Sequence, residues 1–135
     1  MENIPDTLSL FDVSGKVALI TGASGGFGQA ASKGLAKAGA KVMLTGRSED
    51  KLAPLAKEIN DAGYAAAYVA GEPSNEEDVK RIVEETVKAF GGIDILITAA
   101  GVSRVKPITE FPTEEFDMIM DANVKGTWLV CREAG

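Results

Sequence analysis

Short apolar segments alternate with stretches of helical periodicity along the sequence, and this alternation limits the fold more than any other feature. The apolar segments have the length of strands and are bounded by glycine or polar residues, as strands buried on both faces are. Between them, apolar residues recur every three or four positions, which is typical of helices with one buried face. The predicted strands are residues 16–21, 41–45, 65–70 and 93–98, and the predicted helices are residues 26–38, 48–62, 75–90 and 113–132.

This alternation predicts an α/β fold, a Rossmann-type doubly wound parallel sheet with strand order 3-2-1-4 and right-handed crossovers. Gly39 and Gly63 stand where glycines end helices, and Thr113 is predicted to cap the helix that follows the loop 101–112. The fourth strand would be left as an apolar edge. We therefore expect the C-terminal half of the sheet to be absent, with residues 1–14 as a polar lead-in and residues 15–135 as one incomplete domain.

Composition excludes several classes of function. The chain carries 14 basic and 20 acidic residues, for a net charge of -6, and its basic residues are scattered, so we expect no nucleic-acid partner. It has no histidine and a single cysteine, Cys131, so neither a metal site nor an internal disulfide is expected. No apolar run approaches the ~20 residues that cross a bilayer, and the N-terminus does not resemble a signal peptide. These features predict a cytoplasmic protein without a membrane segment.

The segment TGASGGFG, residues 21–28, joins the first strand directly to a helix. Such a turn places backbone N–H groups and the positive end of a helix where a pyrophosphate can bind. Glycine permits the sharp turn at Gly22, the approach of phosphate at Gly26, and the packing of helix on sheet at Gly28. The alternative is a turn that is tight for structural reasons alone. The dinucleotide-binding candidates in this segment are Gly22, Ser24, Gly26, Phe27 and Gly28.

Arg47 follows the second strand, where the ribose of a dinucleotide is recognised. An acidic residue there binds the 2′-hydroxyl of NAD, whereas a guanidinium pairs with the 2′-phosphate of NADP. Thr45 and Ser48 are candidate hydroxyl donors beside it. We therefore predict NADP(H) as the preferred cofactor and keep NAD(H) as possible, since Arg47 can also be an ordinary surface residue.

The spacing Thr-Gly-x-x-x-Gly-x-Gly, preceded by SGKVALI, resembles the short-chain dehydrogenase/reductase family. Nearly the whole chain is similar to this family, because TGR at residues 45–47, TAAG at residues 98–101 and Asn123 also fall at the family's positions. The resemblance implies an NAD(P)-dependent oxidoreductase that transfers hydride between nicotinamide and a small carbonyl or alcohol substrate. It also implies a homo-oligomer for the full-length form.

The chain departs from the family at two cofactor-binding segments. The family has Asn-Asn-Ala-Gly after the fourth strand, where this chain has Thr98 followed by Ala99, Ala100 and Gly101, so two amide side chains are missing. The backbone of these residues is still expected to lie beside the cofactor ribose. Glu72 stands where the family often has an aspartate that contacts adenine, and its alternative is a solvated carboxylate in a turn.

The family's catalytic tyrosine, lysine and serine would lie beyond residue 135, and only its asparagine has a counterpart, Asn123. The resemblance gives Asn123 a structural role in catalysis, at a local break in its helix. Tyr64 and Tyr68 are not followed by lysine at the fourth position, so the chain alone is expected to be inactive. We read it as the N-terminal part of a longer oxidoreductase, from a truncated gene product or an incomplete sequence. The alternative is a non-catalytic dinucleotide-binding or interaction module.

Overall fold

A computed structural model of the chain describes residue 6 and residues 8–135. Its centre is a parallel sheet with the strand order β3-β2-β1-β4, which confirms the predicted order. The predicted lead-in falls partly outside the described residues, and its described part carries a 3-10 helix at Ser9–Phe11. The strands are β1 (Val17–Thr21), β2 (Lys41–Gly46), β3 (Ala66–Ala70) and β4 (Ile95–Thr98).

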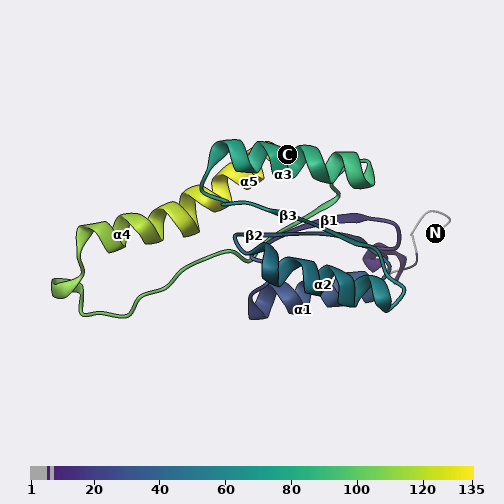
Figure 1. The fold of residues 1–135 in the computed structure, drawn as a ribbon, viewed down its shortest axis with the longest axis horizontal. Coiled ribbons are helices and arrows are strands. Elements are labelled where there is room, and N and C mark those ends of the chain that lie inside the picture. Colours follow the sequence, from purple (N-terminus) through teal and green to yellow (C-terminus); the bar gives the residue numbers. More distant parts are fainter. Residues whose placement is uncertain (1–5, 7) are drawn as a thin grey trace.

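Helices cover both faces of this sheet, as the alternation predicts. Helices α1 (Gly26–Lys37) and α2 (Glu49–Asp61) lie on one face, and α3 (Glu76–Phe90) and α5 (Gly126–Ala134) lie on the other (Figure 1). Each face has its own apolar core, because alternate residues of a strand point to opposite faces. Ile20 and Leu44 pack with the first pair of helices, while Leu19 and Met43 pack with the second pair.

Local chemistry sets where these helices begin and end. The side chain of Asn75 accepts the backbone N–H of Asp78 at 3.0 Å, so Asn75 caps α3 from outside the helix. Gly39 and Gly63, which follow α1 and α2, have φ angles of 95° and 88°. Residues other than glycine are strained in this left-handed region, so the predicted stop positions of both helices are confirmed.

The helix predicted for residues 113–132 is interrupted. It consists of α4 (Thr113–Met120), a π-helical turn (Asp121–Lys125) and α5. The prediction that Thr113 caps it is wrong, because Pro112 is the cap residue and Thr113 is the first residue of α4. Pro112 has a φ of −65° and a ψ of 142° and lacks an N–H group, so it directs the chain into the helix without a side-chain hydrogen bond.

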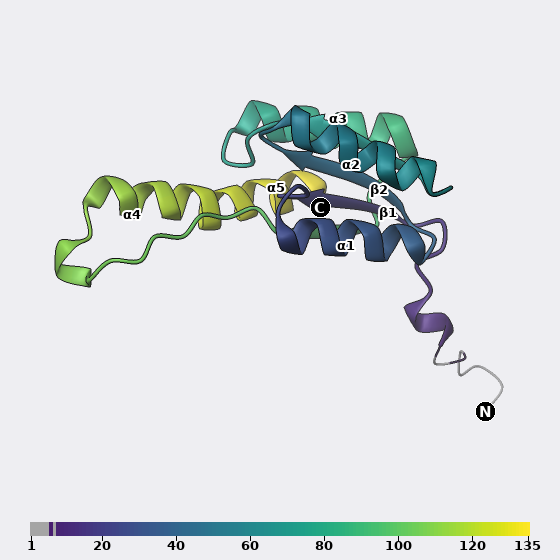
Figure 2. The ribbon, with the colours of Figure 1, turned by 60° about the horizontal axis from the view of Figure 1, so that its bottom comes forward.

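The segment after β4 and helix α4 extend beyond the end of the sheet. Both ribbon views show this arm, with α5 leading back onto the sheet (Figures 1 and 2). Its apolar side chains are open to solvent, with 96% of Val105 and 91% of Ile108 exposed. Strand β4 is one edge of the sheet, and its three apolar residues, 95–97, are only partly buried, which agrees with the predicted apolar edge.

Leu19 tests the importance of the central strand, because its side chain is completely buried at the middle of β1. Leu19→Ala removes apolar contacts and leaves a cavity, so we expect the free energy of unfolding to fall by about 3 kcal/mol. Urea denaturation followed by circular dichroism measures this change. Val105→Ala is the control, since its exposed side chain should change stability by less than about 0.5 kcal/mol. Equal effects of the two substitutions would contradict the described packing.

Candidate functional site

A cavity of about 530 Å³ lies where the carboxyl ends of all four strands meet. In open α/β sheets this edge is the usual ligand site, particularly where the strand order reverses, as it does here between β1 and β4. The segments that follow the strands line the cavity, together with one side of the α4 helix and the π-helical turn. The lining residues are Gly22, Ser24, Gly25, Gly46, Arg47, Ser48, Lys51, Glu72, Pro73, Ser74, Ala99, Ala100, Gly101, Val102, Met118, Asp121 and Ala122.

Two glycines of the TGASGGFG segment are required by backbone packing. A Cβ atom at Gly22, whose φ is 63°, would lie 2.5 Å from the backbone nitrogen of Ala100. A Cβ atom at Gly28 would lie 2.1 Å from the carbonyl oxygen of Gly22. Both distances are shorter than atoms tolerate. The first glycine therefore lets the loop after β1 touch the loop after β4, and the second lets α1 pack against the turn, as the sequence predicts.

The structure brings together most of the predicted dinucleotide-binding residues, but not all of them. Gly26, Phe27 and Gly28 belong to the first turn of α1 and do not line the cavity. Phe27 is 89% exposed and Gly28 is buried. Gly25 lines the cavity instead, as the residue that precedes α1. The predicted residues that do line it are Gly22, Ser24, Arg47, Glu72, Ala99, Ala100 and Gly101.

Two threonines at neighbouring strand ends are buried and have different surroundings. The hydroxyl of Thr21 accepts the backbone N–H of Ala100 at 3.3 Å and so ties the end of β1 to the segment after β4. Thr45 is completely buried, and its hydroxyl has no hydrogen-bond partner within the described part of the chain. Thr45 therefore does not face the cavity, and the prediction that it donates a hydrogen bond beside Arg47 is wrong.

Arg47 and Glu72 are neighbours in the wall of the cavity. Their Nε and Oε2 atoms are 3.8 Å apart, and the side chains of Arg47 and Glu72 are 71% and 38% exposed. The backbone N–H and the hydroxyl of Ser74 both donate to the other carboxylate oxygen of Glu72, at 3.4 and 3.2 Å. Glu72 is thus a paired carboxylate, and this pairing with Arg47 and Ser74 is not predicted by the sequence.

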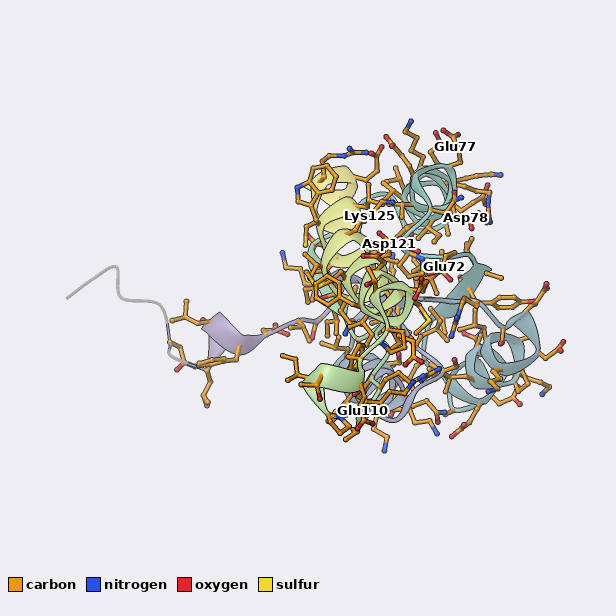
Figure 3. All side chains as sticks on the ribbon, turned by 90° about the vertical axis from the view of Figure 1, so that its left-hand side faces the viewer. Glu72, Glu77, Asp78, Glu110, Asp121 and Lys125 are labelled. Carbon is orange, nitrogen blue, oxygen red and sulfur yellow. The ribbon has the colours of Figure 1, made fainter. Side chains whose placement is uncertain are left out.

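Two charged residues of the cavity were missed by the sequence reasoning. Lys51 lies in the first turn of α2, and Arg47 lies before that helix begins, so no helical spacing relates the two residues in the sequence. Asp121 is distant in sequence, and its carboxylate lies 3.8 Å from the Nζ atom of Lys125. Figure 3, which looks onto this end of the molecule, shows Glu72 and Asp121 arriving from different elements. Nothing in the local sequence around Asp121 indicates that it lines the same cavity as Glu72.

Asn123 lies beside the cavity and holds the segment after β4. Its Oδ1 atom accepts the backbone N–H of Val102 at 2.8 Å, and its Nδ2 atom donates to the Val102 carbonyl at 2.9 Å. A Cβ atom at Gly101 would lie 3.1 Å from the same Oδ1 atom. Asn123 belongs to the π-helical turn, so the interruption of the helix and the anchoring of the loop coincide.

The remaining polar candidates lie elsewhere. Neither Tyr64 nor Tyr68 lines the cavity, and the hydroxyl of Tyr68 donates to Glu49 at 3.3 Å. Arg104 and Lys106 line a second cavity, of about 620 Å³, between the segment after β4 and α4. In the described part of the chain, no group of three or more candidate ligands is placed to hold a metal ion. Nor does any helix there combine the length and apolar character needed to cross a membrane.

Comparison with known proteins places this geometry in a family. Residues 16–134 match the short chain dehydrogenase family. The chain belongs to this family. An uncharacterized oxidoreductase of Mycobacterium tuberculosis is 44% identical over 129 residues, which are 95% of this chain and 47% of that protein. A glucose 1-dehydrogenase of Gluconobacter oxydans is 41% identical over 121 residues, 89% of this chain and 46% of that protein.

A solved structure shows the same fold. A short-chain type dehydrogenase/reductase from Mycobacterium marinum superimposes with a TM-score of 0.91 and 38% sequence identity, over 96% of this chain and 52% of that one. The chain thus spans about half the length of the relatives that it matches. The resemblance inferred from the motifs is confirmed, and so is the expectation that the chain corresponds to only part of a short-chain dehydrogenase.

Asn123→Ala should release the segment after β4, because the backbone of Val102 loses both partners. We expect the Val102 amide to exchange with deuterium roughly tenfold faster, the equivalent of about 1.4 kcal/mol. Asn60 offers a matched control, since its side chain holds the backbone of Ala66 through the same pair of hydrogen bonds. Asn60→Ala should accelerate exchange at Ala66 and leave Val102 unchanged. Unchanged exchange at Val102 in Asn123→Ala would contradict the anchoring role.

Asp78 gives the turn before α3 a pH-dependent stability. The backbone N–H of Glu72 and the guanidinium of Arg81 donate to its carboxylate and hold its pKa below the ordinary 3.8. A lowered pKa stabilises the fold above the ordinary value, and this contribution is lost as pH falls through the folded-state pKa. Asp78→Asn should therefore show a smaller loss of stability than the unaltered chain when pH is lowered below about 4. Urea denaturation at pH 6 and pH 3 measures the loss of stability of each protein. Equal losses in Asp78→Asn and the unaltered chain would contradict this role of Asp78.

Proposed function

We propose that this chain supplies the cofactor-binding half of an NAD(P)-dependent oxidoreductase, which transfers hydride between nicotinamide and a small carbonyl or alcohol substrate. The observation that carries the proposal is the cavity at the strand ends, lined by the glycine turn, by Arg47 and by the backbone at residues 99–101. Gly22 and Ala100, which both line this cavity, lie in close contact, and a Cβ atom at Gly22 would prevent that contact. The residues present therefore fit a dinucleotide.

Each part of the cavity has a binding role in this proposal. The turn at Gly22 and Gly25, with the Ser24 hydroxyl and the N-terminus of α1, offers donors to a pyrophosphate. The backbone from Ala99 to Gly101 lies beside the ribose and nicotinamide, and Asn123 fixes that backbone through Val102. Bound nicotinamide supplies the hydride chemistry, and the protein supplies orientation and electrostatics.

NADP(H) is the preferred cofactor in this proposal, and NAD(H) is the possible alternative. The side chain of Arg47 is largely exposed at the cavity, where a guanidinium suits a 2′-phosphate. Its neighbour Ser48 also lines the cavity. The Ser48 side chain forms no capping hydrogen bond with α2, so its hydroxyl is not engaged in that role.

We further propose that residues 15–135 form an incomplete domain and that this chain by itself does not turn over substrate. The two described tyrosines lie outside the cavity, so no phenol is placed there as a general acid. The chain spans about half of its relatives' length, and the catalytic groups would come from the other half. The full-length protein is proposed to be a homo-oligomer.

A non-catalytic dinucleotide-binding module is the second candidate. Thr98 and Ala99 favour it, because they replace the family's two asparagines in the segment that faces the nicotinamide end. Turnover separates the candidates. The protein encoded by the whole gene should oxidise NADPH in the presence of aldehydes or ketones if it is an oxidoreductase, and should bind NADPH without consuming it if it is a module.

Ser24→Asp tests dinucleotide binding at the cavity. The substitution puts a carboxylate among the backbone donors that face the phosphates, so we expect NADPH affinity to fall at least about tenfold. Ser9→Asp is the control, because this exposed residue lies in the 3-10 helix outside the cavity and should keep full affinity. Titration of NADPH fluorescence measures both. An equal affinity for the two variants, or no binding by the unaltered chain, would overturn the proposal.

A further inference from the structure

We infer that Lys51 is a specificity-determining residue for the 2′-phosphate of NADP(H), and that Glu72 weakens the attraction of Arg47 for the same phosphate. This inference rests on the proposed function and names residues that determine the choice of cofactor within the same cavity. Three charged side chains, those of Arg47, Lys51 and Glu72, line this part of the cavity. The two cations, Arg47 and Lys51, differ because only one of them has an anionic partner among the described residues.

Arg47 is the paired cation. Its guanidinium lies 3.8 Å from the Glu72 carboxylate, which Ser74 holds in place through its backbone N–H and its hydroxyl. The backbone of Glu72 is itself held, because its N–H donates to Asp78 at 2.9 Å. The carboxylate is therefore a fixed part of the cavity wall. A phosphate that approaches Arg47 meets a negative charge beside the guanidinium, and this charge reduces the attraction.

Lys51 is the unpaired cation. It projects from the first turn of α2, is exposed, and takes part in none of the ion pairs formed by residues 8–135. It lines the cavity together with Arg47 and Ser48. A lysine ammonium is a compact charge on a flexible stem, so it can move toward a phosphate without breaking an existing interaction. Lys51 thus offers the 2′-phosphate the charge that Glu72 partly removes from Arg47.

Lys57, the other basic residue of α2, does not share this property. Lys57 lies on the same helix, its Nζ atom is 2.5 Å from the Asp61 carboxylate, and it does not line the cavity. Lys57→Gln therefore removes the same charge from the same helix as Lys51→Gln, away from the cavity. It is the matched control for a general change in the protein's electrostatic field.

The experiment compares adenosine 2′,5′-bisphosphate with 5′-AMP, two probes that differ only by the 2′-phosphate. Isothermal titration calorimetry gives both dissociation constants for the unaltered protein, Lys51→Gln, Lys57→Gln and Glu72→Gln. Their ratio isolates the recognition of the 2′-phosphate and is not changed by a general loss of the adenosine site. Lys51→Gln should reduce the preference for the bisphosphate about fivefold and weaken its dependence on salt, with 5′-AMP affinity unchanged. Lys57→Gln should keep the original ratio.

Glu72→Gln should raise the preference for the bisphosphate about threefold, because the amide still accepts from Ser74 while its negative charge is gone. An unchanged ratio in both Lys51→Gln and Glu72→Gln, with 5′-AMP and the bisphosphate still bound, would overturn the inference and leave the proposed function standing. Lack of binding of either probe by the unaltered protein would instead overturn the proposed function, and the inference with it.

Discussion

The parallel pairing of β1 with both β2 and β4 is the interaction on which the rest of the structure depends. Thr21, the last residue of β1, is in register with Thr45 on one side and Thr98 on the other, so three strands end at the same level. The loops that follow these strands then converge, and Gly22 allows the loop after β1 to touch the loop after β4 at Ala100. The cavity depends on this register, because loops that follow several strands line it together.

Charge at this cavity is balanced rather than uniformly positive. The cations Arg47 and Lys51 and the anions Glu72 and Asp121 line it. Arg47 pairs with Glu72, and Asp121 pairs with Lys125. The turn at the end of β1 contributes backbone donors instead of cationic side chains. In the proposed function, backbone amides and a helix N-terminus would bind the pyrophosphate, while the side-chain cations Arg47 and Lys51 would distinguish NADP(H) from NAD(H).

The sequence predicts the strand order, the helix stops at Gly39 and Gly63 and the packing role of Gly28, because periodicity and backbone sterics are local properties. It does not predict the partners of side chains that meet from distant segments. Glu72 is a predicted adenine contact whose pairing with Arg47 was not predicted. Thr45 was expected at the site and is buried, and Asp121 was not expected there. The cap at Pro112 was missed because a threonine before two glutamates resembles an N-cap equally well.

We propose that the loops after the four strands together bind one dinucleotide. The most direct measurement is a titration of the ¹⁵N-labelled protein with NADP⁺, followed through the backbone amide resonances. The account predicts shifts at Gly22 and Gly25, at Arg47, at Glu72 and Ser74, and at Ala100 and Gly101, all saturating at one ligand concentration. Shifts confined to residues 103–116 of the projecting arm, or no shifts at all, would contradict it.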